Sequence, residues 1–426
     1  MNLLIKSARI IKAEEPANDK TFDIYIEDGG YKNIALAISQ TDCKKGTIVF
    51  DAKGKCISIG WFDLRANFRE PGFERKETII SGINAAIAGG FTGVALMPSV
   101  NPVLQTRADI EFVISKSHGA ITDIYPMGAL TLNRDGKDIT EMYDMKCGGA
   151  VAFTDDDRFV KDSGVMLRAM QYVQQINSKI VTYCDDTGLS GNNSTNESAN
   201  TALLGFKGAP AIAEEIALER DLSLCRYSGV SIHISGISTK GSVDIIRKAK
   251  KEGQPITCEV DIHHLMLNDA ALSEFDTNYK VKPPLRSKDD TDALIKGVVD
   301  GIIDAIVSNH SPEDIESKNV EWDFASYGSI GLESCFGVMN TVLSGKMNLS
   351  QLIEKITVNP RKILGIEVPV IKTGEKANFT IFDPELEWTF GENNIKSLSK
   401  NTPYIGRKLK GKVIAVGNKD LFESLT

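Results

Sequence analysis

The sequence predicts an α/β protein in which a (β/α)₈ barrel is joined to a small sheet domain built by both ends of the chain. Two observations predict it. The middle of the chain alternates short apolar runs with amphipathic segments, as parallel strands joined by helices do. Both ends instead carry short alternating runs separated by turn residues, which is typical of antiparallel strands.

The N-terminal part of the sheet domain is predicted over residues 1–55. Gly, Asp and Asn separate its apolar runs, which occupy 2–11, 22–27, 34–38 and 47–50. The C-terminal part is predicted over residues 366–426, with strands at 377–383 and 408–416. Together they should form one β-sandwich domain that places the two termini near each other.

The barrel is predicted to span residues 56–365. Its strand-like runs lie at 57–64, 92–97, 150–153, 180–184, 230–235, 256–260 and 305–308. Helical patterns lie at 77–88, 165–176, 242–250 and 352–356. A strand followed by a helix and another strand implies parallel pairing, and the number of strands is close to the eight that a closed barrel requires.

Composition, charge and cysteine content exclude several classes of protein. The 426 residues are 42% hydrophobic and 25% charged, so the chain can bury a large core. A net charge of -8 without a long basic cluster argues against a nucleic-acid partner. Seven scattered cysteines without a Cys-x-x-Cys pair indicate reduced thiols. The N-terminus lacks the apolar stretch of a signal peptide or membrane span, so a cytoplasmic location and no membrane contact are expected.

Six short motifs follow one another along the chain. They are Phe68-Arg69-Glu70-Pro71-Gly72, Met97-Pro98 with Asn101-Pro102-Val103, Ala152-Phe153-Thr154-Asp155-Asp156, His263-His264-Leu265, Pro283-Pro284-Leu285-Arg286-Ser287 and Lys400-Asn401-Thr402-Pro403. Through these motifs, in this order, the chain resembles the dihydroorotases of the amidohydrolase superfamily over essentially its whole length. The resemblance implies a TIM barrel of the metal-dependent hydrolase type.

Family members hold two zinc ions, and the resemblance places their ligand positions at Arg65, Asn67, Asp156, Tyr183, Gly236 and Asn309. The family pattern has two histidines, a bridging aspartate, two further histidines and a final aspartate that also shuttles the proton. Only Asp156 keeps the family's residue type. Because arginine stays protonated and a catalytic zinc needs about three protein ligands, we expect neither a metal nor another cofactor.

The positions that the resemblance assigns to the substrate are altered as well. Arg69, which in the family grips the substrate carboxylate, is present. Ser99 and Lys282 stand where asparagines are expected, and Glu313 stands where a histidine is expected. Asp156 would be an unpaired buried carboxylate without a cation, so we predict that Arg65 or Lys282 pairs with it. We also expect Arg65, Tyr183 and Lys282 to fill the cavity.

The remaining candidate ligands have simpler interpretations. His263 and His264 match a family pair that lies away from the metals, and His233 is interpreted as a core residue. His310, with Asp156, Cys184 or Asp155, could form a rebuilt single-metal site. The acidic run 155–157 could suggest magnesium or calcium but is interpreted as strand-end carboxylates.

Three functions remain open. The favoured one is a pseudoenzyme of pyrimidine biosynthesis, which acts as a structural or regulatory partner of aspartate carbamoyltransferase and forms a homo-oligomer. The alternative is an active dihydroorotase, or another cyclic amide hydrolase, with zinc in a rebuilt site. The third is a module that binds a small anion through Arg69.

Overall fold

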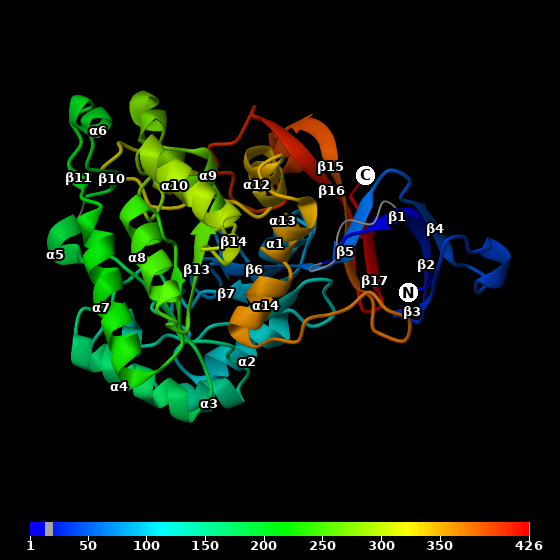
Figure 1. Ribbon diagram of the computed structural model, residues 1–426, viewed down its shortest axis with the longest axis horizontal. Helices are drawn as coiled ribbons and strands as arrows, with labels where there is room; N and C mark the ends of the chain where they lie inside the picture. Colours follow the sequence, from blue (N-terminus) through cyan, green and yellow to red (C-terminus); the bar gives the residue numbers. More distant parts are fainter. Residues whose placement is uncertain (13–19, 192, 426) are drawn as a thin grey trace.

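The protein is described by a computed structural model that covers residues 1–12, 20–191 and 193–425. It has two parts: a large body of strands surrounded by helices, and a sheet domain where both termini lie (Figure 1). The N-terminal amino group is 3.2 Å from Asp420 Oδ1, so the two ends of the chain meet as predicted.

The large part is a closed barrel of parallel strands. One sheet contains β6 (Trp61–Ala66), β7 (Phe91–Leu96) and β8 (Asp123–Pro126), and the other contains β9 (Ile180–Tyr183), β12 (Ile232–Ser235), β13 (Ile256–Asp261) and β14 (Ala305–Val307). Parallel bridges from Phe153 to Gly128 and to Ile180 join the two sheets, and a bridge from Ala66 to His310 closes the ring. The segment at Phe153 is therefore the eighth strand, and the predicted (β/α)₈ barrel is confirmed.

Helices cover the barrel. The longer ones are α1 (Ile79–Ala88), α2 (Arg107–Lys116), α4 (Ser163–Gln175), α7 (Ile212–Ser228), α8 (Lys240–Lys251), α10 (Lys288–Val299) and α12 (Cys335–Leu343). The shorter ones are α3 (Met142–Cys147), α5 (Thr187–Ser190), α6 (Ala199–Leu203), α9 (Ile262–Met266), α11 (Ile315–Lys318), α13 (Leu349–Glu354) and α14 (Val358–Leu364). A strand pair, β10 (Thr195–Asn196) and β11 (Gly208–Ala209), flanks α6.

Local signals explain where several helices begin. Thr78 accepts a hydrogen bond from the backbone of Ser81 and so caps α1, and Thr239 caps α8 in the same way through Ser242.

The prediction missed α7, although it is the longest helix. Its buried face includes the carboxylates Glu214 and Asp221, which hide the apolar periodicity.

The sheet domain follows the strand order β17-β16-β15-β5-β1-β2-β3, with β4 paired to β1. Its strands are β1 (Leu3–Ile10), β2 (Thr21–Glu27), β3 (Gly30–Ala35), β4 (Ile48–Asp51), β5 (Cys56–Ile59), β15 (Asn378–Thr389), β16 (Lys408–Asn418) and β17 (Leu421–Ser424). The predicted run 57–64 is in fact two strands, because Gly60 separates β5 from β6. The barrel thus begins after residue 60 and not at residue 56.

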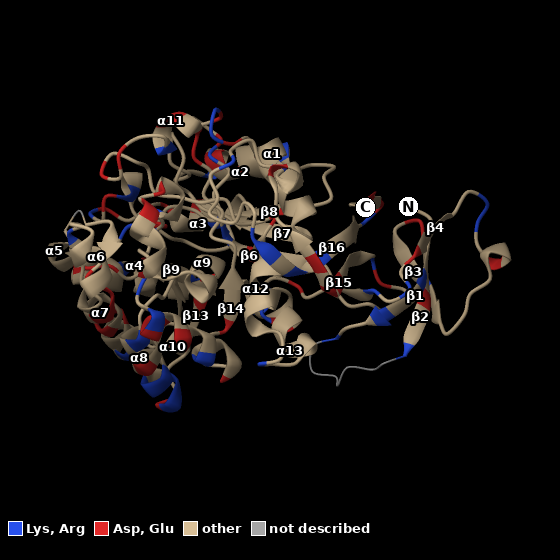
Figure 2. Ribbon diagram, turned by 90° about the horizontal axis from the view of Figure 1, so that it is seen from above, with Lys and Arg blue, Asp and Glu red and all other residues tan. Residues whose placement is uncertain are grey.

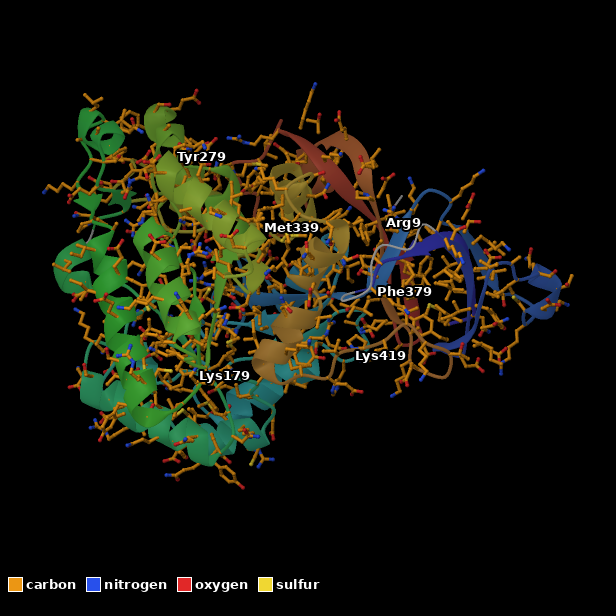
Figure 3. The ribbon with its side chains drawn as sticks, in the orientation of Figure 1. Arg9, Lys179, Tyr279, Met339, Phe379 and Lys419 are labelled. Atoms are coloured by element: carbon orange, nitrogen blue, oxygen red, sulfur yellow. The ribbon has the colours of Figure 1, made fainter. Side chains whose placement is uncertain are left out.

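Each part has its own core. Phe379 of β15 packs with Leu3 and Ile24 inside the sheet domain, whereas Met339 of α12 belongs to the barrel core (Figure 3). Acidic and basic residues are interspersed along the outer barrel helices (Figure 2). Arg247 of α8, for example, lies 3.2 Å from Asp300 after α10.

None of the helices in the described part of the chain combines the length and the hydropathy that a membrane span requires.

Candidate functional site

The residues singled out from the sequence meet where the barrel strands end. Arg65 is the next-to-last residue of β6, Tyr183 ends β9, and Asp156 follows the strand segment at Phe153. Gly236 directly follows β12, and Asn309 is the second residue after β14. The carboxyl ends of the strands form the face on which sites of this fold lie, so the positions are correctly placed for a site.

Arg65 occupies the centre of this face and is almost fully buried, with 2% of its surface exposed. Its Nη2 donates to Asp156 Oδ1 at 3.4 Å, and its Nη1 donates to Ser235 Oγ at 3.3 Å. Its guanidinium carbon lies 5.6 Å from the centre of the Tyr183 ring. The predicted ion pair between a cation and Asp156 is present, and Arg65 forms it.

The missing side chain at Gly236 makes room for this arginine. A Cβ atom at that position would lie 2.6 Å from Arg65 Nη1, closer than two such atoms approach. The backbone of Gly236 also has a φ of +64°, a region that favours glycine. The guanidinium therefore fills volume that a larger residue at 236 would occupy.

A second buried carboxylate lies behind the arginine. Glu259 of β13 accepts from Ser235 Oγ at 2.6 Å and is 3.2 Å from His233 Nε2. Burial alone would lower the pKa of Arg65, but the charges of Asp156 and Glu259 raise it. The guanidinium thus stays charged and pairs with Asp156, while Glu259 is held by Ser235 and His233.

Asp156 is further fixed by short-range contacts. Its Oδ2 accepts from Ser99 Oγ, and its backbone N–H donates to Thr154 Oγ1 at 2.9 Å. Lys282, the other predicted counter-ion, does not pair with it. The Nζ of Lys282 donates to the carbonyl of Asp157 at 2.7 Å and lies 3.7 Å from its carboxylate.

Asp157 lies between two cations. Its carboxylate contacts Arg134 Nη2 as well as Lys282 Nζ. Burial would raise the pKa of Asp157, but Lys282 and Arg134 together lower it to about 2. Arg158 follows directly and donates to the backbone carbonyls of residues 133 and 134.

Asn309 belongs to a hydrogen-bonded group below the mouth of the barrel. Its Nδ2 donates to Asp261 Oδ2 at 3.0 Å, and the other oxygen of Asp261 is 2.7 Å from His264 Nδ1. His264 Nε2 lies 3.1 Å from the carbonyl of Pro284. Both ring nitrogens face acceptors, so His264 carries a positive charge that Asp261 balances.

Arg69 is satisfied by groups of the protein itself. Its Nη2 donates to Glu313 Oε1 at 2.8 Å and to Ser311 Oγ at 2.6 Å, and its Nε donates to the carbonyl of Pro312 at 3.0 Å. Glu313 also pairs with Lys76. The Glu313 carboxylate therefore already neutralises the arginine that the resemblance assigns to a substrate carboxylate.

We expect Glu313→Gln to lower the free energy of unfolding by about 2 kcal/mol, because it leaves two partly buried cations without their carboxylate. Urea denaturation of the purified variant measures this change. Glu316→Gln is the matched control, since Glu316 is largely exposed and lies 3.5 Å from an exposed Arg75. An equal effect of both substitutions would contradict the importance of the Arg69 contact.

The histidines do not gather around Asp156. The ring of His310 is fully buried and points to the backbone amides of Gly331 and Leu332, with Nε2 3.6 Å from Glu77. His263 is hydrogen-bonded to Tyr404 at 2.9 Å, and its ring stacks on the tyrosine ring. The geometry does not form the rebuilt site of His310 with Asp156, Cys184 or Asp155.

The residues present do not fit the zinc site that the family implies. A guanidinium stands against the one remaining carboxylate of the ligand set. The described residues contain no group of three or more His, Cys, Asp or Glu side chains arranged to hold a metal ion. An arginine that is charged and directed at Asp156 would repel the ion that the family's members place there.

The expectation that large side chains fill the cavity is wrong in part. A cavity of about 350 Å³ remains beside Arg65, Asn67, Arg69, Ser99, Asp156, Lys282, Asn309 and Glu313. A larger cavity of about 1280 Å³ adjoins it and shares Lys282 and Tyr327 as lining residues. Arg65 turns toward Gly236 and Ser235, which leaves the space above it open.

Sequence reasoning missed two residues of the site, Ser235 and Glu259. The available signal was an acidic residue within the apolar run 256–260 of a barrel strand. A carboxylate there is buried by the barrel and needs a partner, so it could have been sought as a partner of Arg65.

Comparisons with known proteins agree with this architecture. A family model described as "Dihydro-orotase-like" matches residues 54–242. A protein named dihydroorotase from Thermoanaerobacter sp. (strain X514) is 41% identical, with 97% of this chain and 95% of the relative covered. A dihydroorotase from Trichlorobacter lovleyi is 39% identical, with 99% of each chain covered.

Solved structures share the fold. The L-hydantoinase (dihydropyrimidinase) from Arthrobacter aurescens has a TM-score of 0.85 at 21% identity and covers 100% of this chain and 97% of that one. A D-hydantoinase (dihydropyrimidinase) from Thermus sp. has a TM-score of 0.82 at 20% identity, covering 99% and 96%. With relatives near 40% identity along almost its whole length, the chain belongs to the dihydroorotase family of the amidohydrolase superfamily.

Proposed function

We propose that this chain is a dihydroorotase-family protein that does not perform metal-dependent hydrolysis. The observation that carries the proposal is the guanidinium of Arg65, which lies buried 3.4 Å from Asp156, where the resemblance would have a histidine ligand. Water activation in such sites needs a cation that binds and acidifies water, and a guanidinium has no open coordination position.

We propose further that the protein acts as a structural or regulatory partner of aspartate carbamoyltransferase in pyrimidine biosynthesis, as a cytoplasmic homo-oligomer. Both the barrel and the sheet domain are complete, whereas the ligand set of the site is replaced. A protein of this kind can still present the outer surface of the family. Support for this partner comes from the resemblance to the family alone.

The alternative is an active dihydroorotase or another cyclic amide hydrolase that holds zinc in a rebuilt site. Two observations favour it. The relatives that align over nearly the whole chain are named dihydroorotase, and a cavity of about 350 Å³ with Arg69 in its lining remains at the barrel mouth.

A direct assay separates the two functions. We expect the purified protein to contain far less than one zinc per chain and to open the ring of dihydroorotate no faster than buffer, with or without added zinc. Enzymes typically exceed the uncatalysed rate by about a millionfold or more. The rates expected for an inactive protein and for an active dihydroorotase therefore differ widely. Elemental analysis and a spectrophotometric ring-opening assay measure both quantities.

A second experiment restores the family's residue types at the five altered ligand positions. The variant carries Arg65→His, Asn67→His, Tyr183→His, Gly236→His and Asn309→Asp together. We expect it to recover zinc only in part, because the groups that orient the ligands also differ. Stoichiometric zinc with chelator-sensitive turnover in the unaltered protein would contradict the proposed loss of hydrolysis. Co-migration with the carbamoyltransferase in size-exclusion chromatography tests the partner, and separate elution would contradict it.

A further inference from the structure

A wide cavity of about 1280 Å³ adjoins the site at the barrel mouth. It lies against the segment that contains α5, α6, β10 and β11, which stand together at one side of the barrel (Figure 1). Pockets for small molecules commonly measure about 300–1,000 Å³, so this cavity has room for an organic ligand. Its lining mixes basic with acidic side chains, so charge alone selects neither an anion nor a cation.

Three aromatic side chains form a cluster in the lining of this cavity. They are Phe206, Phe275 and Trp322, which come from three separate segments of the chain. The centre of the Phe206 ring lies 5.2 Å from the centres of the other two rings, at interplanar angles of 51° and 46°. Rings tilted in this way do not cover one another's faces, and 48% of the Phe275 surface is exposed. Open aromatic faces favour a planar ligand that can stack on them.

The same cavity is lined by a carboxylate without a partner. Asp185 is the second residue after β9, and its side chain makes neither a hydrogen bond nor an ion pair with any described residue. The residue is only partly exposed. A carboxylate accepts hydrogen bonds and cannot donate them, so Asp185 favours a ligand that carries O–H or N–H donors.

The hydroxyl of Tyr183 is a second unpaired group in the lining. Tyr183 is 4% exposed, and its hydroxyl makes no hydrogen bond to a residue in the described part of the chain. This hydroxyl is not sealed inside the protein, because it keeps accessible surface on the cavity. Buried hydroxyls nearly always have a partner, so this one marks a place for a polar group of a ligand.

The unpaired carboxylate lies near the aromatic cluster. Burial raises the pKa of Tyr183 and of Tyr327, and the negative charge of Asp185 raises both further, so Asp185 is close to both tyrosines. Tyr327 in turn is hydrogen-bonded to Ser194, whose Oγ accepts from Trp322 Nε1 at 2.9 Å. Because Tyr327 and Ser194 connect the carboxylate to the cluster, one ligand can contact both.

We propose that this cavity binds a ribonucleoside. Its base stacks on the aromatic cluster, and the two neighbouring hydroxyls of its ribose donate to Asp185. A carboxylate holds a ribose hydroxyl in the same way in dinucleotide-binding folds. The Tyr183 hydroxyl bonds a further oxygen of the ligand. A planar ring without hydroxyls would leave Asp185 unpaired, and a sugar without a base would leave the aromatic faces in water.

Isothermal titration calorimetry of the full-length protein with adenosine and uridine tests the proposal. We expect at least one of them to bind with a dissociation constant on the order of 0.1 mM. The free base and the 2′,3′-dideoxy form of the tighter ligand should bind about tenfold more weakly, because the donors to Asp185 are absent. Lys161 and Lys207 are exposed in the lining. Tighter binding of the 5′-monophosphate would therefore identify the ligand as a nucleotide, and equal or weaker binding would identify it as a nucleoside.

Asp185→Ala should weaken ribonucleoside binding about tenfold and leave binding of the dideoxynucleoside unchanged. Phe206→Leu should weaken both ligands alike, whereas Asp244→Ala, at an exposed position of α8, should change neither. Thermal melting of each variant checks that it folds. Absence of binding by both ribonucleosides at about 5 mM, or an equal loss for both ligands in Asp185→Ala, would overturn the inference. Neither outcome bears on the proposed loss of hydrolysis, which is judged from zinc content and ring opening.

Discussion

Replacing Arg65 with glutamine should lower the free energy of unfolding by about 3–5 kcal/mol, the effect typical of breaking a buried ion pair from one side. The substitution leaves Asp156 buried without its cation and removes a positive charge that Glu259 favours, and both carboxylates are at most 5% exposed. It also removes the donors to Asp156 and to Ser235. Urea denaturation followed by circular dichroism measures the change.

The double variant Arg65→Gln/Asp156→Asn isolates the pair. If the loss comes from an unpaired carboxylate, neutralising Asp156 should restore part of it, and the double-mutant cycle should give a coupling energy of at least about 1 kcal/mol. Arg168→Gln provides the matched control on an exposed surface. A loss below about 1 kcal/mol for Arg65→Gln would mean that water, not the guanidinium, compensates the carboxylates.

The general architecture was predictable because its signals are local. Apolar runs of the right length predict the barrel strands, and the sequence motifs mark the loops at their carboxyl ends. β8 was missed because the run Asp123–Pro126 is short and carries Asp and Pro at its ends. Such a strand forms because it pairs with β7, and this pairing cannot be inferred from the local sequence.

For the site, the sequence predicts which residues are charged but not which of them pair. A buried Asp156 requires a cation, and Arg65 was one of two candidates. The choice between them depends on geometry, because Lys282 reaches the adjacent Asp157 instead. The pairing of Arg69 with Glu313 and the contact of Arg65 with Gly236 join residues more than 150 positions apart, which no local pattern indicates.

The ion pairs of the site have one feature in common. Side-chain cations neutralise the carboxylates near the barrel mouth: Arg65 at Asp156, Lys282 and Arg134 at Asp157, and His264 at Asp261. A side-chain cation cannot leave, so these three carboxylates do not need a metal ion for their charge balance. We infer that removal of metal by a chelator leaves stability unchanged, unlike that of a protein whose carboxylates face zinc.

The pair of Asp261 and His264 gives the second large effect. Asp261→Asn should cost about 3–5 kcal/mol near pH 5.5, since it leaves a charged His264 buried and weakens the acceptor of Asn309. Burial would lower the pKa of His264, but Asp261 raises it above 6.5. Burial would raise the pKa of Asp261, but His264 lowers it below 3.8.

The pH dependence follows from these directions. The stability that His264 contributes is complete below its unfolded pKa of 6.5 and is lost as the pH rises through its raised folded pKa. The stability that Asp261 contributes is present above 3.8 and is lost as the pH falls through its lowered folded pKa. The difference between the unaltered protein and Asp261→Asn should therefore be largest between these two values and should shrink in alkaline solution.

Unfolding free energies measured by urea titration at several pH values test this expectation. Asp244→Asn is the matched control, because Asp244 is exposed on α8 and should give a small difference at every pH. A difference for Asp261→Asn that does not change between about pH 5.5 and pH 9 would show that His264 is neutral in the folded protein. In that case only one ring nitrogen would carry a proton, and either Asp261 or the Pro284 carbonyl would face a ring nitrogen that cannot donate.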